Sequence, residues 1–237
     1  MNFILFEDWF TRFLAPFSHM HASFEVRCGF YTNMERLVNL LEPTDLLTLI
    51  VRDEMKNLIK ERFPHAQVNP TEVNAGVWLN GTAVWDKKNL DIVKAGHSFG
   101  GDDILFGFVC ENPVKFEEKE NLFRSMKSVT AQLPVKHISF LWDSISLSHE
   151  QIFDDFTDHH RTFKNNIYRS AVLVDEENIS IGKDTKISAG TIIDASSGPI
   201  IIGSGVAIDI GSLIKGPVII GAGSRINPGS KLRGNVI

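Results

Sequence analysis

The chain has 237 residues, of which 43% are hydrophobic and 22% are charged, and its formal net charge is -5. This length allows one large or two ordinary domains, and the negative charge argues against a surface for nucleic acid or anionic membrane. The start of the chain lacks the basic segment of a signal peptide, and no apolar run approaches the roughly 18 residues of a membrane span. The two cysteines, Cys28 and Cys110, do not suggest a disulfide framework. We therefore expect a cytoplasmic protein.

Strands and helices are expected to alternate over the first 170 residues. Apolar stretches predict strands over 2–6, 46–51, 77–79, 83–85 and 104–109. Capping boxes and apolar faces at helical spacing predict helices over 32–41, 53–63, 120–133 and 148–163. Between two of the strands, Asn80-Gly81 predicts a hairpin turn. The pattern is typical of an α/β layered domain with a mostly parallel sheet.

The composition changes near residues 168–178. Every Phe, Trp and Tyr lies at or before Tyr168, whereas eleven of the 18 glycines lie from Gly182 onward. Acidic and basic residues balance over 171–237, so the net charge of -5 belongs to residues 1–170. Such a shift marks a domain boundary, and we expect one domain over 1–170 and a second over 171–237.

The second segment repeats with a period of six residues. Apolar side chains recur at this spacing, with one step of nine, at Ile181, Ile187, Ile193, Ile202, Ile208, Ile214, Ile220, Ile226 and Leu232. This period is typical of a parallel β-helix, in which three hexads form a coil of 18 residues. The segment Gly198-Pro-Ile-Ile-Ile-Gly203 recurs 18 residues later from Gly216, so these corners should stack. We expect about three coils, a bulge near 194–197 and a β-helix that is incomplete at Ile237.

These repeats resemble the left-handed β-helix acyltransferases. An α/β domain followed by such repeats resembles the bifunctional enzymes that join N-acetylglucosamine-1-phosphate uridylyltransferase to glucosamine-1-phosphate N-acetyltransferase, and especially a divergent branch of sugar nucleotidyltransferases. The segment 194–203 is the best match. Weaker matches are Arg27-Cys28-Gly29, Asn80-Gly81, Trp142-Asp143 and Asp155-Phe156. A Thr-Arg-Pro of that branch is lost here, and Thr82 replaces an arginine.

The resemblance implies a Rossmann-type nucleotidyltransferase-like domain that uses sugar phosphates and nucleotides, with Mg²⁺. It also implies acetyl-CoA as a co-substrate if the acyltransferase function is present, bound along the β-helix face of a homotrimer. Arg27, Gly29, Asn80 and Gly81 would contact substrate in such an enzyme.

Some residues oppose the nucleotidyltransferase hypothesis, and others are compatible with it. This chemistry normally uses a glycine-rich basic loop after the first strand, because backbone amides and a cation neutralise the triphosphate. Here Glu7-Asp8 follow the strand and would repel phosphate. Arg12 and Arg27 are either anion ligands or surface arginines. Asp102 and Asp103 precede a strand and are either Mg²⁺ ligands or part of a polar turn.

Acyl transfer needs a general base, most often histidine. All eight histidines lie at or before His160, so none falls within the repeats. Two hypotheses remain open. The chain is a transferase-family protein of sugar-nucleotide metabolism, or it is a catalytically inactive binding or trimer-forming protein of the same family.

Overall fold

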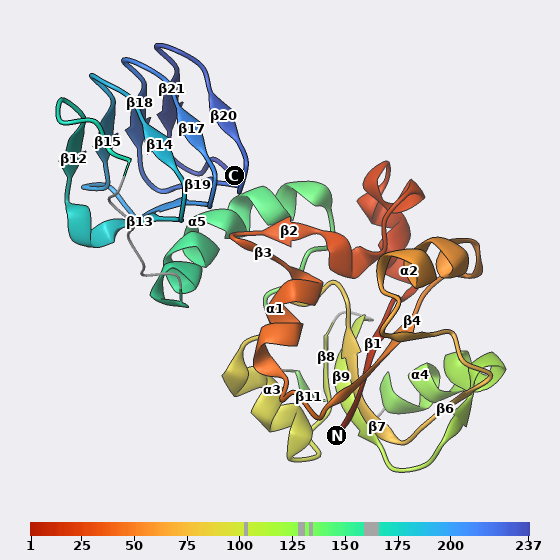
Figure 1. Ribbon diagram of the computed structural model, residues 1–237. Helices are drawn as coiled ribbons and strands as arrows, with labels where there is room; N and C mark the ends of the chain where they lie inside the picture. The colour runs from red at the N-terminus through yellow and green to blue at the C-terminus, as the bar shows by residue number, and fades with distance from the viewer. Residues whose placement is uncertain (102–103, 128–130, 133–134, 159–165) are drawn as a thin grey trace. The chain divides into compact units, whose positions relative to one another are not determined.

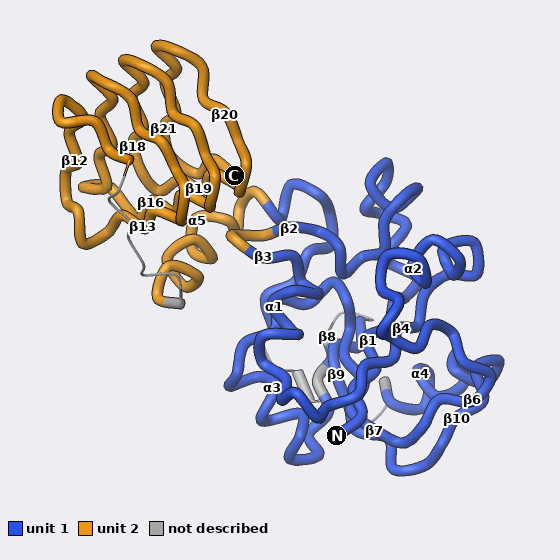
Figure 2. The backbone as a smooth tube through the Cα atoms, viewed as in Figure 1, with its two compact units in different colours: residues 1–27, 31–144 blue, residues 28–30, 145–237 orange. Residues whose placement is uncertain are grey.

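The structure is a computed structural model that describes residues 1–101, 104–127, 131–132, 135–158 and 166–237. The chain forms two compact units, one of residues 1–27 and 31–144 and the other of residues 28–30 and 145–237 (Figure 2). Composition placed a boundary at 170/171, where the repeats begin. The contacts divide the chain between Ser144 and Ile145, because much of the preceding helix packs with the repeats.

The first unit is built around a seven-stranded sheet with the order β11-β8-β9-β7-β1-β4-β5 (Figure 1). Its strands are β1 (Asn2–Phe6), β4 (Leu46–Ile50), β5 (Gln67–Val68), β7 (Gly76–Asn80), β8 (Phe99–Gly101), β9 (Ile104–Cys110) and β11 (Ala131–Gln132). β1 is parallel to β4 and β7, β4 to β5, and β8 to β11, whereas β9 is antiparallel to β7 and β8. The mixed α/β architecture and the mostly parallel sheet are therefore confirmed.

Helices cover both faces of this sheet, because successive strand residues point to opposite faces. Phe3 and Leu5 pack on one face beneath α1, α2 and α3, whereas Ile4 and Phe6 pack on the other against α4. These helices are α1 (Asn33–Leu40), α2 (Lys56–Arg62), α3 (Lys87–Lys94) and α4 (Lys119–Lys127). Among the described helices, none is long and apolar enough to cross a membrane.

Short elements connect these layers. The paired short strands include β6 (Glu72–Val73) with β10 (Val114–Lys115), and β2 (Arg27–Cys28) with β3 (Tyr31–Thr32). The 3₁₀ turns are η1 (Trp9–Leu14), η2 (Phe17–His19), η3 (Ser23–Glu25), η4 (Asp53–Met55) and η5 (Phe116–Glu118). Of these, η1 follows β1 directly and matters most for the candidate site.

Local sequence signals predict several elements of this unit well. The expected strands at 2–6, 46–51 and 104–109 are β1, β4 and β9. The capping box that starts α1 is confirmed, since the Thr32 Oγ1 accepts from the Glu35 N–H at 3.1 Å and the Glu35 Oε2 accepts from the Thr32 N–H at 2.8 Å. The helix expected over 53–63 is formed by η4 and α2 together.

The predicted hairpin at Asn80-Gly81 is wrong. β7 ends at Asn80, and its neighbours in the sheet are β1 and β9. The Gly81 N–H donates to the Phe6 carbonyl at 2.8 Å, and the Thr82 N–H donates to the Asn80 Oδ1 at 2.9 Å. The chain therefore leaves the sheet at this point, and Ala83 forms a bridge to His137 instead of pairing back on β7.

Two predicted helix boundaries are also wrong. A helix was expected over 120–133, but α4 ends at Lys127 and residues 131–132 form β11. The last helix, α5 (Leu141–Asp158), begins before the capping box predicted at Ser148. The Asp143 Oδ2 accepts from the N–H groups of Ser139 and Phe140 at 2.9 and 2.8 Å, which satisfies backbone donors at the true start. The expected end at 163 lies outside the described residues.

The second unit contains three parallel sheets of short strands, ordered β12-β15-β18-β21, β13-β16-β19 and β14-β17-β20 (Figure 1). The strands are β12 (Val172–Val174), β13 (Ile179–Ile181), β14 (Lys186–Ile187), β15 (Ile192–Asp194), β16 (Ile200–Ile202), β17 (Ala207–Ile208), β18 (Leu213–Lys215), β19 (Val218–Ile220), β20 (Arg225–Ile226) and β21 (Lys231–Arg233), with a 3₁₀ turn η6 (Glu176–Asn178). Each strand pairs with the strand three further along the chain, which occupies the same position in the next coil. This arrangement is consistent with a parallel β-helix.

The strand register follows the repeat. Ile200 pairs with Val218, 18 residues on, whereas Ile179 pairs with Ile200, 21 residues on. The three extra residues lie before Gly198, whose N–H donates to the Ala195 carbonyl at 3.0 Å in a turn. The stacked corners and the bulge predicted from the sequence are therefore confirmed.

Two layers of apolar side chains hold the second unit together. The repeated residues face inward, and those from Ile181 to Ile220 are buried, whereas Ile226 and Leu232 are partly buried. Ile201 of β16 and Ile219 of β19 pack instead with Ile152 of α5. One face of the stacked coils is thus covered by α5.

Candidate functional site

The carboxyl ends of β1, β4 and β7 meet at one edge of the first unit's sheet. β1 is the central strand of the three, with Phe6 in register with Ile50 of β4 and with Asn80 of β7. The chain order reverses here, since β4 lies on one side of β1 and β7 on the other. In open α/β sheets, ligands bind outside the carboxyl ends of the strands at such a switch point. This edge is the candidate site.

Asn80 and Asp8 join two of these strand ends. The Asn80 amide nitrogen donates to the Asp8 Oδ2 and to the Leu105 carbonyl, both at 2.9 Å. The other Asp8 oxygen accepts from the Phe10 N–H at 2.9 Å and thereby caps η1. Hydrogen bonds to both carboxylate oxygens thus orient the Asp8 side chain, and Asp8 fixes the start of the turn that follows β1.

Glu7 and Arg52 join β1 to β4. The Glu7 Oε1 accepts from the Arg52 Nη1 at 2.7 Å and from the Ser23 N–H at 2.8 Å, and its Oε2 accepts from the Arg52 N–H at 3.0 Å. Burial raises the pKa of the Glu7 carboxyl above its usual range, and the charge of Arg52 opposes that rise. The Arg52 Nη2 also donates to the Ser18 carbonyl at 2.6 Å. This ion pair therefore anchors the chain around 18–23 against the sheet.

The turn η1 presents an aromatic ring and a cation at this edge. Thr11 and Leu14 are buried and hold the turn, whereas the Trp9 side chain is 69% exposed. The guanidinium carbon of Arg12 lies 3.6 Å from the centroid of the Trp9 ring and 4.8 Å from that of Phe13. Arg12 is therefore held by cation–π contacts and keeps its N–H groups available for an anion.

Two adjoining hollows open at this edge. The larger one has a volume of about 460 Å³ and is lined by Trp9 and by side chains of both charges. The cations are Arg12, Arg52 and Lys119, and the carboxylates are Glu7, Asp8, Asp53, Glu54 and Glu120. The size of this hollow falls within the range of roughly 300–1,000 Å³ that small-molecule sites occupy.

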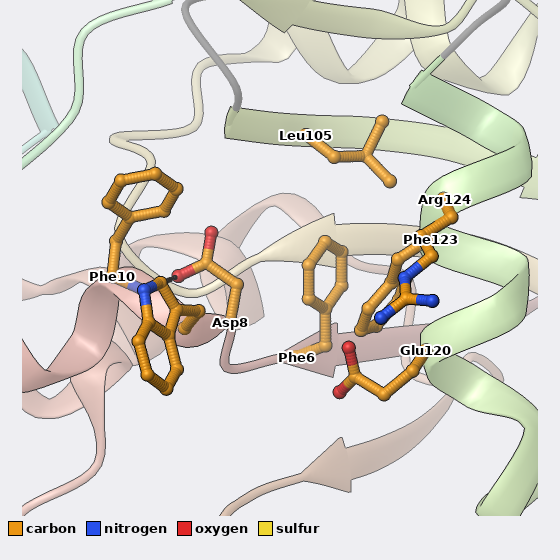
Figure 3. A pocket seen from close by; sticks show the side chains of 8 residues that line it. Phe6, Asp8, Phe10, Leu105, Glu120, Phe123 and Arg124 are labelled. Atoms are coloured by element: carbon orange, nitrogen blue, oxygen red, sulfur yellow. Dashed lines mark hydrogen bonds between the residues drawn. The ribbon is translucent and has the colours of Figure 1, made fainter.

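The smaller hollow has a volume of about 120 Å³ and lies beside α4 (Figure 3). Its apolar lining includes Phe6 and Phe123, with Asp8 on one side and Glu120 and Arg124 of α4 on the other. Asp8, Trp9 and Glu120 line both hollows, so the two form one continuous candidate site.

Comparison with known proteins identifies the family of this chain. The sequence profile of the sugar nucleotidyl transferases matches residues 3–162, which is more than half of the chain. The chain belongs to the sugar nucleotidyl transferase family. No curated relative gives a significant match. In this member of the sugar nucleotidyl transferase family, the match covers β1 from Phe3 onward, all of β4 and β7, and the chain segments that line both hollows.

The structure brings some of the predicted site residues together at this edge and separates others. Arg12 lines the larger hollow, Asn80 ends β7 and contacts Asp8, and Gly81 directly follows it. Arg27 is exposed, and its guanidinium forms an ion pair with Glu35 at 3.2 Å. Arg27 lines neither hollow.

Gly29 has a structural role within the second unit. It has φ +78°, and a side chain there would overlap the Asp155 carboxylate, which accepts from the Phe30 N–H at 2.7 Å. The predicted metal ligands Asp102 and Asp103 lie outside the described residues.

Sequence reasoning missed several residues of this candidate site. Glu7 and Asp8 were taken only as groups that repel phosphate, yet both have hydrogen-bond partners that fix the edge. Trp9, Arg52 and Lys119 were not singled out. A usable signal was present for the first two, because each comes soon after a predicted parallel strand, at the end where such sheets bind ligands. Lys119 is distant in sequence, and only the fold brings it to the hollow.

Proposed function

We propose that the first unit transfers a nucleotidyl group to a sugar 1-phosphate at the edge formed by β1, β4 and β7. A phosphate oxygen of the sugar phosphate attacks the α-phosphorus of a nucleoside triphosphate. A new P–O bond forms to the α-phosphorus, and the bond from this phosphorus to the bridging oxygen breaks and releases pyrophosphate. Family membership supports the reaction class. The open hollow at the switch point supports the location.

The observation that carries the proposal is the pair of available cations in this hollow. Arg52 is neutralised by Glu7, but Arg12 and Lys119 form no ion pair within the described residues. Each lies over an aromatic ring, Arg12 over Trp9 and Lys119 over Phe116 at 4.0 Å. Two cations held in place without a carboxylate partner favour binding of phosphate groups.

The family chemistry implies Mg²⁺, and the described carboxylates fit that ion poorly. Glu7 and Asp8 already accept hydrogen bonds on both of their oxygens. No three His, Cys, Asp or Glu side chains converge on one point within the part of the chain that the structure describes. We therefore assign no resident Mg²⁺ to these residues. Asp102 and Asp103, which lie outside the described residues, stay predicted Mg²⁺ ligands.

For the second unit we propose a left-handed β-helix that assembles the chain as a homotrimer. Val172, Ile192 and Leu213 stand in register on β12, β15 and β18, and their exposed fractions are 48%, 39% and 39%. An exposed row of aliphatic side chains on a rigid face is typical of a surface that another subunit covers. Acetyl transfer from acetyl-CoA stays a further hypothesis, because the repeats contain no histidine that could serve as the general base.

A catalytically inactive binding or trimer-forming protein is the second candidate. The observation that favours it is the chain after β1, where carboxylates replace the glycine-rich loop that normally cradles a triphosphate. Both candidates bind anions at the same hollow, so only turnover separates them.

The deciding experiment measures pyrophosphate release from a panel of nucleoside triphosphates and sugar 1-phosphates, alongside thiol release from acetyl-CoA. We expect pyrophosphate release that falls about tenfold or more in Arg12→Ala, since a charge-assisted contact to phosphate contributes roughly 1.5–3 kcal/mol. Arg225→Ala removes an exposed arginine from the β-helix and is the matched control, with unchanged turnover expected. Silence of the wild-type protein across the whole panel would favour the inactive candidate.

A further inference from the structure

Trp9 is a large aromatic side chain that the fold leaves open at the candidate site. It begins η1, and its backbone is positioned by the Asp8 cap and by burial of Thr11 and Leu14, while its own side chain stays 69% exposed. The Trp9 side chain lines both hollows. Burial of the ring therefore contributes little to the fold, although the turn fixes the backbone that carries it.

One face of this ring is already occupied by a cation. The Arg12 guanidinium lies over it at 3.6 Å from the ring centroid, and Phe13 holds the guanidinium from a second direction at 4.8 Å. The indole thus has the guanidinium on one side, and Trp9 is exposed enough to accept a flat partner as well. Stacking of a nucleic-acid base on an aromatic side chain is a common and sequence-tolerant mode of binding.

We propose that the base of the bound nucleotide stacks on the indole of Trp9. This inference rests on the proposed nucleotide binding and adds a residue that positions the base. The nucleobase is the only planar aromatic group in a nucleoside triphosphate or a sugar 1-phosphate. Trp9 lines the same hollow as Arg12 and Lys119, the two cations proposed to bind the phosphates. Trp9 would set how tightly a nucleotide binds without discriminating strongly among bases, since every base has a π-face.

The test compares three probes on the full chain by calorimetry: a nucleoside triphosphate, inorganic tripolyphosphate and glucose 1-phosphate. We expect Trp9→Ala to weaken binding of the nucleoside triphosphate about tenfold or more and to weaken tripolyphosphate binding much less, because Phe13 still contacts the Arg12 guanidinium. An equal loss for both probes would show that Trp9 acts only through Arg12 and would overturn the inference. Trp9→Phe should restore most of the lost affinity, because phenylalanine keeps an aromatic face. Trp142→Ala is the matched control, since Trp142 is 62% exposed, stacks on Phe140 and lines neither hollow.

The outcomes separate this inference from the proposed function. If wild type binds the nucleoside triphosphate and Trp9→Ala binds it equally well, the stacking inference fails while the proposed function stands. Weaker binding of glucose 1-phosphate alone would place the sugar ring on the indole and also overturn the inference. If wild type binds neither the nucleoside triphosphate nor tripolyphosphate, both proposals fail. Circular dichroism of each variant confirms that the exposed substitutions leave the fold intact.

Discussion

Asn80 uses its whole side-chain amide to join three chain segments. Its nitrogen donates to Asp8 and to the Leu105 carbonyl, and its oxygen accepts from the N–H and Oγ1 of Thr82 at 2.9 and 2.8 Å. The residue is fully buried, so water cannot replace these partners. These contacts at the last residue of β7 explain why a turn dipeptide here ends a strand and does not form a hairpin.

Asn80→Ala should therefore lower the free energy of unfolding by about 3 kcal/mol, because it leaves buried donors and an acceptor without partners. The same variant should also lose pyrophosphate release, since Asp8 and η1 lose their anchor. Urea denaturation gives the stability, and Asn39→Ala, on the exposed face of α1, provides the control with little expected change. A loss below about 1 kcal/mol would contradict the role given to this network.

Glu7 makes a second residue-scale prediction, which concerns pH. Burial raises its pKa above the ordinary 4.5, and the Arg52 guanidinium limits the rise. A carboxyl with a raised pKa binds its proton more tightly in the folded state. Its contribution to the free energy of unfolding is thus fully present below the unfolded pKa and is lost as pH rises through the folded pKa.

The comparison is between wild type and Glu7→Gln, which does not titrate. The stability of wild type relative to Glu7→Gln should fall as pH rises from about 4 to about 7, as urea denaturation at each pH would measure. Glu118→Gln repeats the chemical change at an exposed site. A relative stability that instead rises with pH would show that pairing with Arg52 outweighs burial.

At the scale of elements, local signals succeed where local contacts decide the structure. The α1 capping box is satisfied by residues three apart, and the hexad spacing fixes which isoleucines face inward. The same signals fail where distant residues decide. Asn80-Gly81 resembles a hairpin turn, yet β7 pairs with β1 and β9, which are distant in sequence.

The candidate site follows the same rule. Arg12, Asn80 and Gly81 were expected to contact substrate, and the fold brings Arg12 and Asn80 to this edge because each is near a strand end in sequence. The partner of Glu7 could not be predicted, because Arg52 lies 45 residues further on. Neighbouring residues in the sequence do not predict which distant residues will pair in the fold.

α5 gives the element-scale prediction. Ile152 is fully buried and packs against Ile201 and Ile219 on the covered face of the coils. Ile152→Ala removes this contact and should cost about 3 kcal/mol in the unfolding of the second unit. Ile145→Ala makes the same change on the same helix at a position that is 69% exposed, and it should have little effect. Equal stability losses in the two variants would contradict the packing of α5 on this face.

At the scale of the whole molecule, the two units are stabilised by different kinds of core. The first unit packs aromatic rings such as Phe6, Trp78, Phe108 and Phe123 beneath α4, with ring centroids 4.7–6.4 Å apart. The second packs isoleucines in stacked coils. Because equivalent positions of successive coils stack, one exposed position per coil becomes a continuous row. Such a row suits assembly better than an isolated contact does.

This row supplies the last prediction, at the level of assembly. Leu213 stands at one end of the row, in register with Ile192 of β15 on one side and Lys231 of β21 on the other, and it is 39% exposed. If the β-helix forms a homotrimer through this face, Leu213→Glu buries a carboxylate in an apolar interface, and the cost of desolvating that charge should dissociate the subunits. Light scattering would then report a trimer for wild type and a monomer for the variant, with unchanged circular dichroism because the position is exposed within one subunit. Leu46→Glu places the same charge on an exposed leucine of β4 and should stay trimeric. A wild-type monomer, or a trimer that survives Leu213→Glu, would contradict assembly through the β12-β15-β18-β21 face.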